Sequence, residues 1–183
     1  MKKVLALGLI SFAFAQAQLF VGVQGSYDLG AEFIGSGKFD SAIYSGRTSN
    51  DGWSAGLSVG NQHNFGRMGL RYFVSADYAQ ALSYSNTHLV DVDLNVDGIL
   101  NFTSSGSFGL FFGLGTGYEI AFVDGNASGT VPLFGRLGLT FTAASKHKID
   151  IGVKLPISGW NVSGGLDTHN SPLRIQAGYK YLF

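Results

Sequence analysis

Charged side chains recur at every second position along several segments of this chain, which is the spacing of one face of a β-strand. In the segment DVDLNVD, Asp91, Asp93 and Asp97 alternate with apolar residues. Over the whole chain, the equivalent faces carry six acids and five bases: Asp77, Asp91, Asp93, Asp97, Glu119, Asp150, Arg71, Arg136, Lys154, Arg174 and Lys180. Enclosed charges must be nearly balanced, because an unpaired buried charge costs several kcal/mol.

Two kinds of chemistry are open to these side chains if they share the inside of one barrel. They could form a narrow path for ions or protons, or they could pair as a salt-bridged polar plug that fixes the barrel shape. The interior of an eight-stranded barrel is just wide enough for side chains to fill. We therefore expect the plug and keep the narrow pore as an alternative.

Other chemical motifs in the chain are incomplete. His169 and Ser171, with Asp167 nearby, could serve a lipid-modifying hydrolase, since a serine nucleophile needs a histidine base and an acid that orients it. No acid follows Ser171, so a polar surface loop is the favoured interpretation. The four histidines share no metal-ligand spacing, and GSGKF and GLGTGY lack residues of the nucleotide-binding motifs. We expect no catalysis, no metal and no cofactor.

The elements that position the charges are predicted by apolar residues of period two. The fifth segment is typical, because Leu110, Phe112 and Leu114 alternate with Gly109, Gly113 and Gly115. Eight such segments are expected as strands, over about 19–29, 53–61, 68–78, 90–97, 108–119, 133–141, 149–157 and 174–183. The chain is predicted to be an all-β, eight-stranded, antiparallel, up-and-down barrel.

Connection lengths are expected to alternate between the two ends of this barrel. Short links fall around His63, Ser104 and Ser145, and longer ones around Ser85 and Asn126. The two longest links are expected from Gly30 to Gly52 and over the residues before the last strand. Outer-membrane barrels have tight periplasmic turns, long outer loops and an even strand count. Both termini are therefore expected in the periplasm.

The alternation of apolar and polar residues does not decide which face of the strands points into the barrel. A soluble ligand-binding barrel would bury its apolar face. Here the polar face is rich in small residues, as a narrow lumen requires. Aromatic residues lie near the predicted strand ends, where membrane barrels carry girdles at the two interfaces. These are Tyr27, Trp53, Tyr78, Phe102, Tyr118, Phe122 and Tyr181. We therefore expect the charged face inside and the apolar face against lipid.

The N-terminal segment predicts export. Lys2 and Lys3 precede a short apolar run that ends in Ala15-Gln16-Ala17, which is the pattern of a signal peptide cleaved between Ala17 and Gln18. We expect residues 1–17 to be the signal peptide and residues 18–183 to be one barrel domain. Cysteine is absent and the formal net charge is zero, so neither a disulfide framework nor a nucleic-acid partner is expected.

Four stretches resemble the barrel of the Helicobacter-type outer membrane protein family: FGRMGLRYFVSADYAQ, DVDLNVDGILNF followed by SFGLFFGLGTGYEI, KHKIDIGVKLPI, and RIQAGYKYLF. The resemblance covers roughly residues 65–183 and implies a surface protein, since members include adhesins and proteins described as porins. The adhesins insert a large ectodomain after the first strand, where this chain has only Gly30 to Gly52. No receptor-binding residue can therefore be transferred.

Resemblance to outer-membrane barrels also implies a role for the terminal strand. Tyr179, Tyr181 and Phe183 would form the signal read by the barrel assembly machinery. The expected partners are this machinery and periplasmic chaperones, then outer-membrane lipids and lipopolysaccharide, with an extracellular ligand possible at the loops. The sequence thus predicts an integral outer-membrane barrel with a structural or surface-interaction role through its outer loops.

Overall fold

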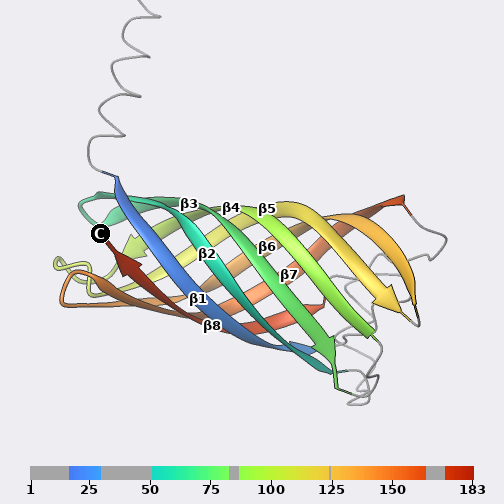
Figure 1. The fold of residues 1–183 in the computed structure, drawn as a ribbon. Coiled ribbons are helices and arrows are strands. Elements are labelled where there is room, and N and C mark those ends of the chain that lie inside the picture. The colour runs from blue at the N-terminus through green and yellow to red at the C-terminus, as the bar shows by residue number, and fades with distance from the viewer. Residues whose placement is uncertain (1–16, 30–50, 83–86, 124, 164–171) are drawn as a thin grey trace, which may run out of the picture.

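Eight antiparallel strands form one closed barrel (Figure 1). The computed structural model describes residues 17–29, 51–82, 87–123, 125–163 and 172–183. The strands are β1 (Gln18–Leu29), β2 (Gly52–Phe65), β3 (Met68–Ala81), β4 (Thr87–Asn101), β5 (Phe108–Val123), β6 (Asn126–Ala143), β7 (His147–Ser163) and β8 (Leu173–Leu182). The predicted fold class is confirmed. Among the described residues there is no helix long and apolar enough to cross a membrane.

The barrel is closed by pairing of its first and last strands. β1 and β8 are in register from Phe20 opposite Leu182 to Leu29 opposite Leu173. Next to the Phe20–Leu182 pair, the Phe183 N–H donates to the Leu19 carbonyl at 2.9 Å. This closure gives every strand two hydrogen-bonded neighbours. A spanning sheet requires such closure, because lipid offers no hydrogen-bond partner to a free edge.

Both ends of the barrel chain lie at one end of the barrel, here called the terminal end, and the other is the distal end (Figure 1). The terminal-end connections are residues 66–67, 102–107 and 144–146. The β6–β7 turn is tight, with positive φ angles of 49° at Ala144 and 61° at Ser145. His63, expected near a link, instead lies within β2.

The distal-end connections are less uniform than the sequence suggested. Residues 30–51 and 164–172 form the two longest, but only residues 124–125 separate β5 from β6. The expected long link around Asn126 is therefore wrong. The two strands continue past the predicted ends as a paired hairpin, with Glu119 opposite Thr130 and Val123 opposite Asn126.

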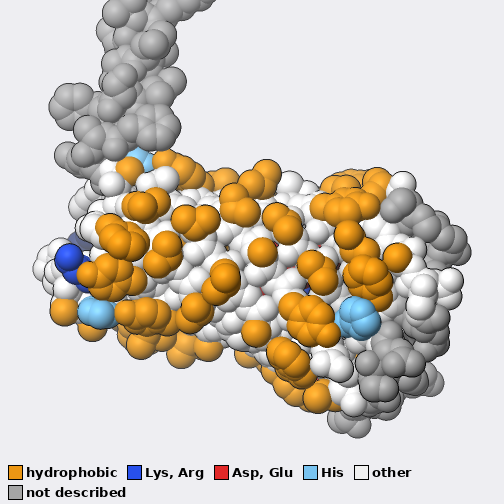
Figure 2. Space-filling view, viewed as in Figure 1, with side chains coloured by type: hydrophobic (Ala, Val, Ile, Leu, Met, Phe, Trp, Pro, Cys, Tyr) orange, Lys and Arg blue, Asp and Glu red, His pale blue; other side chains and the backbone are white. Residues whose placement is uncertain are grey.

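The two faces of the sheet have opposite chemistry. Leu57, Leu94 and Leu114 point outward, each with about 60% of its surface exposed (65%, 61% and 58%), while the charged positions of the same strands point inward. Apolar side chains dominate the outer surface in Figure 2. A membrane barrel shows this apolar-out, polar-in arrangement because its exterior meets lipid.

Aromatic side chains form two belts on this outer surface. Near the distal end, Trp53 contacts Tyr78 with ring centroids 6.1 Å apart, and His88 stacks on Tyr78 and Phe122. Near the terminal end, the belt consists of Phe102, Phe108, Phe141, His147, Tyr179, Tyr181 and Phe183. Such girdles mark the two membrane interfaces of outer-membrane barrels.

One strand departs from strict alternation. The β6–β7 register shifts between Leu133, which faces Ser158, and Phe134, which faces Pro156. One extra residue on β7 moves the outward positions from the odd-numbered to the even-numbered residues. Ile157 and Trp160 can therefore both face outward, each 55% exposed.

Candidate functional site: the charged lumen

The lumen holds the charged residues that the sequence grouped on one face. All eleven have 6% or less of their surface exposed: Asp77, Asp91, Asp93, Asp97, Glu119, Asp150, Arg71, Arg136, Lys154, Arg174 and Lys180. They come from β3 to β8, and each sits at an inward position of its strand. Strand pleating brings them together, because alternate residues of a barrel strand face the interior.

Ion pairs in the lumen divide into two clusters that share no member. The terminal cluster is centred on Arg71, which is fully buried. Its Nη2 and Nε bind Asp97 Oδ2 at 2.7 and 3.0 Å, and its Nη1 binds Asp150 Oδ2 at 2.7 Å. Lys180 Nζ reaches the same Asp150 oxygen at 2.6 Å, and Arg136 Nε lies 3.8 Å from Asp97 Oδ1.

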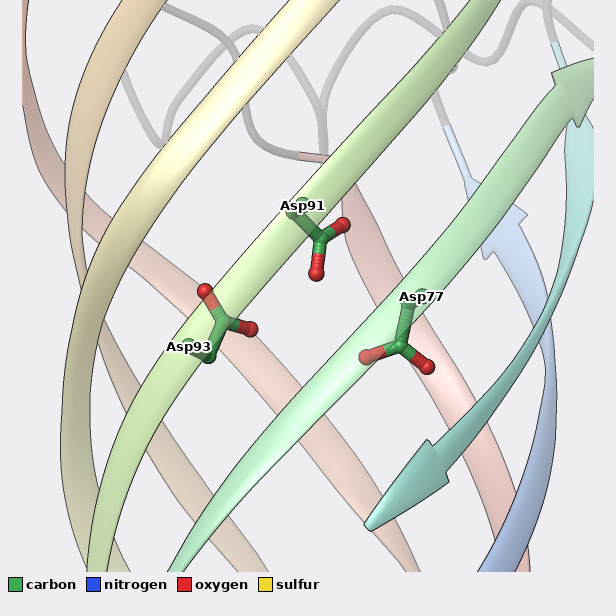
Figure 3. Close-up of side chains that lie close together, drawn as sticks. All are labelled: Asp77, Asp91 and Asp93. Carbon is green, nitrogen blue, oxygen red and sulfur yellow. The ribbon is translucent and has the colours of Figure 1, made fainter.

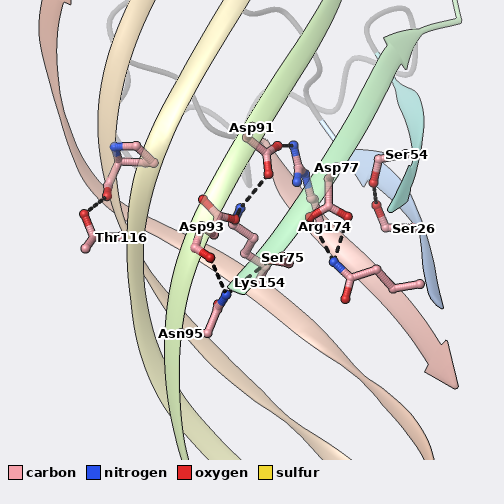
Figure 4. Close-up of polar contacts among 12 residues, drawn as sticks. Ser26, Ser54, Ser75, Asp77, Asp91, Asp93, Asn95, Thr116, Lys154 and Arg174 are labelled. Carbon is pink, nitrogen blue, oxygen red and sulfur yellow. Dashed lines mark hydrogen bonds and ion pairs between the residues drawn. The ribbon is translucent and has the colours of Figure 1, made fainter. Parts of the chain in front are cut away.

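The distal cluster is centred on Asp91 (Figure 4). Arg174 Nη2 binds Asp91 Oδ2 at 2.7 Å, and its Nε lies 3.6 Å from Asp28 Oδ2. Lys154 Nζ binds Asp93 Oδ2 at 2.6 Å and lies 3.9 Å from Asp91 Oδ1. These two bases therefore connect carboxylates on β1 and β4 with β7 and β8.

Asn95 lies between the two clusters and is itself uncharged. Its amide oxygen accepts from Arg136 Nη1 at 3.0 Å, and its amide nitrogen donates to Ser75 Oγ at 3.2 Å. Asn95 is 3% exposed, so both of its polar ends are satisfied inside the lumen. This side chain links the terminal cluster to the neutral groups of β3.

Asp77, Asp91 and Asp93 bring three carboxylates together, with one oxygen of each within 4.8 Å of the others (Figure 3). Hard cations such as Ca²⁺ prefer ligands of this kind. Asp93 and Asp91 are, however, already bound by Lys154 and Arg174, and Asp77 accepts from the Gln24 amide at 2.7 and 2.9 Å. The ammonium and guanidinium groups occupy the cationic role, so this trio belongs to the ion-pair cluster.

Charge is distributed unevenly between the two ends of the lumen. The terminal cluster pairs two acids, Asp97 and Asp150, with three bases. The distal cluster pairs three acids with two bases. Asp77 and Glu119 flank Asp91 on the neighbouring strands and add to the acid excess there. The lumen is therefore more acidic toward its distal end.

Two charged lumen residues lie at positions that the sequence inventory omitted. Asp28 is fully buried at the distal end of β1, opposite Arg174. Lys148 is 2% exposed and donates to Gln62 Oε1 at 2.7 Å. Asp28 shares the polar face with Gln24 and Ser26, so its periodicity could have identified it. Lys148 precedes the expected start of the seventh strand, so the assumed boundary concealed it.

Four inward phenylalanines were also missed, because they interrupt the polar face: Phe20, Phe73, Phe111 and Phe134. They stack against the cations of the lumen. Arg136 Cζ lies 4.7 Å from the Phe73 ring centroid, and Lys154 Nζ lies 3.9 Å from that of Phe134. A ring face attracts a cation, most strongly where water is excluded. The rings thus fill space that the short acids leave and stabilise the buried bases.

Glycines give these large side chains room. A Cβ on Gly115 of β5 would lie 2.3 Å from Phe134 Cε2, and one on Gly113 would lie 2.2 Å from Asp97 Oδ1. The glycines that repeat with the strand period therefore face the crowded lumen. One lumen cavity, lined by residues that include Ser75, Asp77 and Lys154, measures only about 10 Å³. That is room for about one water molecule.

The expected C-terminal signal residues lie on the outer face at the terminal end. Phe183 is 62% exposed and Tyr179 is 40% exposed, and Tyr181 packs edge-to-face on Phe183 at 5.2 Å. Leu182, an apolar residue on the otherwise polar inner face of β8, is buried against Phe20 and Phe73. The last strand thus presents aromatics outward and closes the lumen with an apolar residue.

The remaining sequence predictions concern residues that the structure describes only in part. Ala17 and Gln18 are described, and Gln18 begins β1. Ala15 lies outside the described residues, as do Asp167, His169 and Ser171 of the hydrolase alternative.

Fold and lumen together define an integral membrane β-barrel of the outer-membrane type, with apolar residues outside and paired charges within. The chain belongs to the Helicobacter outer membrane protein family, whose sequence pattern matches residues 56–183. This membership confirms the suspected family and places the chain in the bacterial outer membrane. No curated protein sequence matches this chain.

Solved membrane-barrel structures superimpose on this chain to different extents. Neisserial surface protein A (NspA) superimposes with a TM-score of 0.57 at 14% identity, covering 91% of this chain and 99% of that one. De novo designed transmembrane β-barrels give a TM-score of 0.43 at 13% identity, over 92% of this chain and 96% of theirs. The β domain of the Bordetella autotransporter Brka gives 0.31 at 11% identity, over 92% and 100%. At these identities the NspA likeness concerns the fold alone.

Proposed function

We propose that this barrel has a structural and surface-interaction role, without catalysis, and that its lumen is a closed polar plug. The observation that carries the proposal is the pairing of buried charges in two clusters, with side chains 0–6% exposed. Phenylalanine rings occupy space among these charges. A lumen packed in this way would hold the barrel shape and would block a water path for ions.

Conductance of the full-length barrel in a planar lipid bilayer tests this proposal. A plug predicts no reproducible single-channel steps from unboiled, folded protein. The pore alternative predicts steps whose cation selectivity falls in Asp91→Asn, because this change removes a lumen charge. Conductance that is present and sensitive to Asp91→Asn would establish the pore and overturn the plug.

The proposed orientation puts the distal end outside the cell. The two longest connections, residues 30–51 and 164–172, lie at the distal end, and outer-membrane barrels carry their long loops outside. These connections would present the surface-interaction sites. An epitope inserted after residue 40 should be detected on intact cells, while one after residue 105 should require permeabilisation. The reverse result would show that the barrel has the opposite orientation in the membrane.

The aromatic end of β8 is proposed as the assembly signal, with Tyr179, Tyr181 and Phe183 as its residues. Removal of Phe183 is expected to reduce heat-modifiable barrel in cells, while urea-unfolded protein should still refold in detergent. Phe65→Ala alters another exposed aromatic of the terminal end and serves as the matched control. Equal assembly of the truncated and control proteins would refute the signal.

Residues 1–17 are proposed as a cleaved signal peptide, which leaves Gln18 as the first residue of the mature barrel. The support is positional, since β1 begins at Gln18. The intact mass of the protein extracted from outer membranes should correspond to residues 18–183. Retention of the first 17 residues would refute cleavage.

A further inference from the structure

Charged side chains are nearly absent from the outside of the described barrel. All its acids are buried: Asp28, Asp51, Asp77, Asp91, Asp93, Asp97, Glu119 and Asp150. Six of its bases face the lumen, which leaves Arg67 and Lys146 as the two exposed charged side chains of the described part. Both are basic, and both lie in turns at the terminal end. The described exterior is therefore positive at one rim and uncharged elsewhere.

Lys146 lies beside the aromatic end of β8. Its Nζ is 5.8 Å from the Tyr181 ring centroid, and its carbonyl accepts the Leu182 N–H at 2.8 Å. Next to it, His147 Nδ1 and the Tyr179 hydroxyl are 2.7 Å apart. This group, Lys146, His147, Tyr179 and Tyr181, places an ammonium and polar hydrogen-bonding groups at the edge of an apolar surface.

Arg67 has a comparable setting in the β2–β3 turn. It lies between Phe65 and Met68, which are 55% and 65% exposed, and its carbonyl accepts the Asn101 N–H at 2.7 Å. Arg67 is thus an exposed base in a hydrogen-bonded turn, close in sequence to two exposed apolar side chains. Arg67 and Lys146 therefore lie on separate turns of the same rim. Aromatic belts such as the one at this rim lie at the level of the lipid headgroups.

We propose that this rim, defined by Arg67 and by the Lys146 group, binds the phosphates of anionic phospholipids in the periplasmic leaflet. Charge complementarity carries the inference, because no acidic side chain of the described exterior opposes the two bases. The C-terminal carboxylate of Phe183 lies on the same rim and offsets one charge, whereas cleavage before Gln18 would add an α-amino group. The assignment to the periplasmic leaflet rests on the orientation proposed above.

Spin-labelled phospholipids test this binding with the mature barrel, residues 18–183, in phosphatidylcholine membranes, so that Lys2 and Lys3 do not contribute. The motionally restricted fraction of a phosphatidylglycerol label, relative to a phosphatidylcholine label, measures preference for the anionic headgroup. Each basic residue near a membrane surface contributes roughly fivefold in affinity at low salt. We expect a clear preference in the natural chain, a smaller one in Arg67→Gln or Lys146→Gln, and a ratio near one in the double variant.

Three controls make the result specific. Lys146→Arg should keep the preference, and Ser105→Ala, a neutral change in a turn of the same rim, should leave it unaltered. Heat-modifiable mobility should show that every variant is folded, since the changed residues are exposed in turns. A natural chain without preference, or a preference that survives in the double variant, would overturn the proposal. Symmetric membranes report binding whichever way the barrel points, so the epitope experiment tests orientation separately.

Discussion

Arg71 and Asp150 are joined across the lumen, from β3 to β7, by an ion pair of 2.7 Å. These strands are four positions apart in a ring of eight, so the pair connects opposite walls of the barrel. Arg71 also binds Asp97 on the adjacent β4. One guanidinium, with its fixed fork of donors, thus ties three strands together.

Arg71→Met should therefore destabilise the barrel by about 3 kcal/mol, because removing one partner of a buried pair leaves uncompensated carboxylates. Lys180 and Arg136 still contact Asp150 and Asp97, which keeps the loss toward the lower end of the usual range. Urea unfolding of the refolded protein in detergent measures the change. Arg67→Met makes the same substitution at an exposed turn and should cost less than about 0.5 kcal/mol. Equal costs at the two positions would refute the bridging role of Arg71.

Gly115→Ala should destabilise the barrel by about 2 kcal/mol, because the lumen is too crowded for a methyl group. The added Cβ would lie 2.3 Å from Phe134 Cε2, and Phe134 is itself fully buried. Gly25→Ala is the matched control, since the nearest atom to its Cβ would be the Ser54 carbonyl oxygen at 3.6 Å. Thermal unfolding followed by loss of the fast-migrating gel band compares them. If both variants unfold at the same temperature, packing of the lumen does not require glycine at position 115 of β5.

Leu182→Ala should cost about 3 kcal/mol, because it opens a cavity against Phe20 and Phe73. Leu57→Ala removes the same atoms from a lipid-facing position and should cost less, since lipid fills the space. Unfolding of detergent-refolded protein keeps the measurement independent of assembly in cells. A cost no greater than that of Leu57→Ala would show that the apolar closure of the lumen does not contribute to stability.

The alternation of apolar and polar residues was enough to predict the barrel and the inward position of most charges. Successive side chains of a pleated strand point to opposite faces whatever the neighbouring strands are. Leu110, Phe112 and Leu114 illustrate this on the outer face of β5. The rule failed where the backbone departs from regular pleating, as at the bulge that turns Trp160 outward. It also failed for Phe73, whose environment is set by the guanidinium groups around it.

Partners within the lumen could not be predicted from the sequence. Arg71 meets Asp150 because the tilt of the strands brings β3 and β7 to the same depth, and tilt depends on the closed register of all eight pairs. The same reason concealed the division into an acid-poor terminal cluster and an acid-rich distal cluster. The near balance of the lumen charges can be counted from the sequence. The position of each charge in the lumen depends on the register of the strands.

Asp77 and Asp91 provide the sharpest test of that division. They face each other across the β3–β4 pair, yet their partners differ. Asp91 binds Arg174 at 2.7 Å, whereas both Asp77 oxygens accept from the Gln24 amide. Asp91→Asn should destabilise by about 3 kcal/mol, because it removes the acid that compensates a buried guanidinium.

Asp77→Asn should instead leave the free energy of unfolding unchanged or raise it by about 1 kcal/mol. The change keeps the shape and removes one negative charge from the acid-rich distal half, where like charges repel. Its amide oxygen can still accept from Gln24. Urea unfolding of the two variants side by side, at neutral pH and low salt, gives the comparison. A loss at Asp77 as large as that at Asp91 would mean that both carboxylates compensate the lumen bases, and the inferred acid excess at the distal end would be wrong.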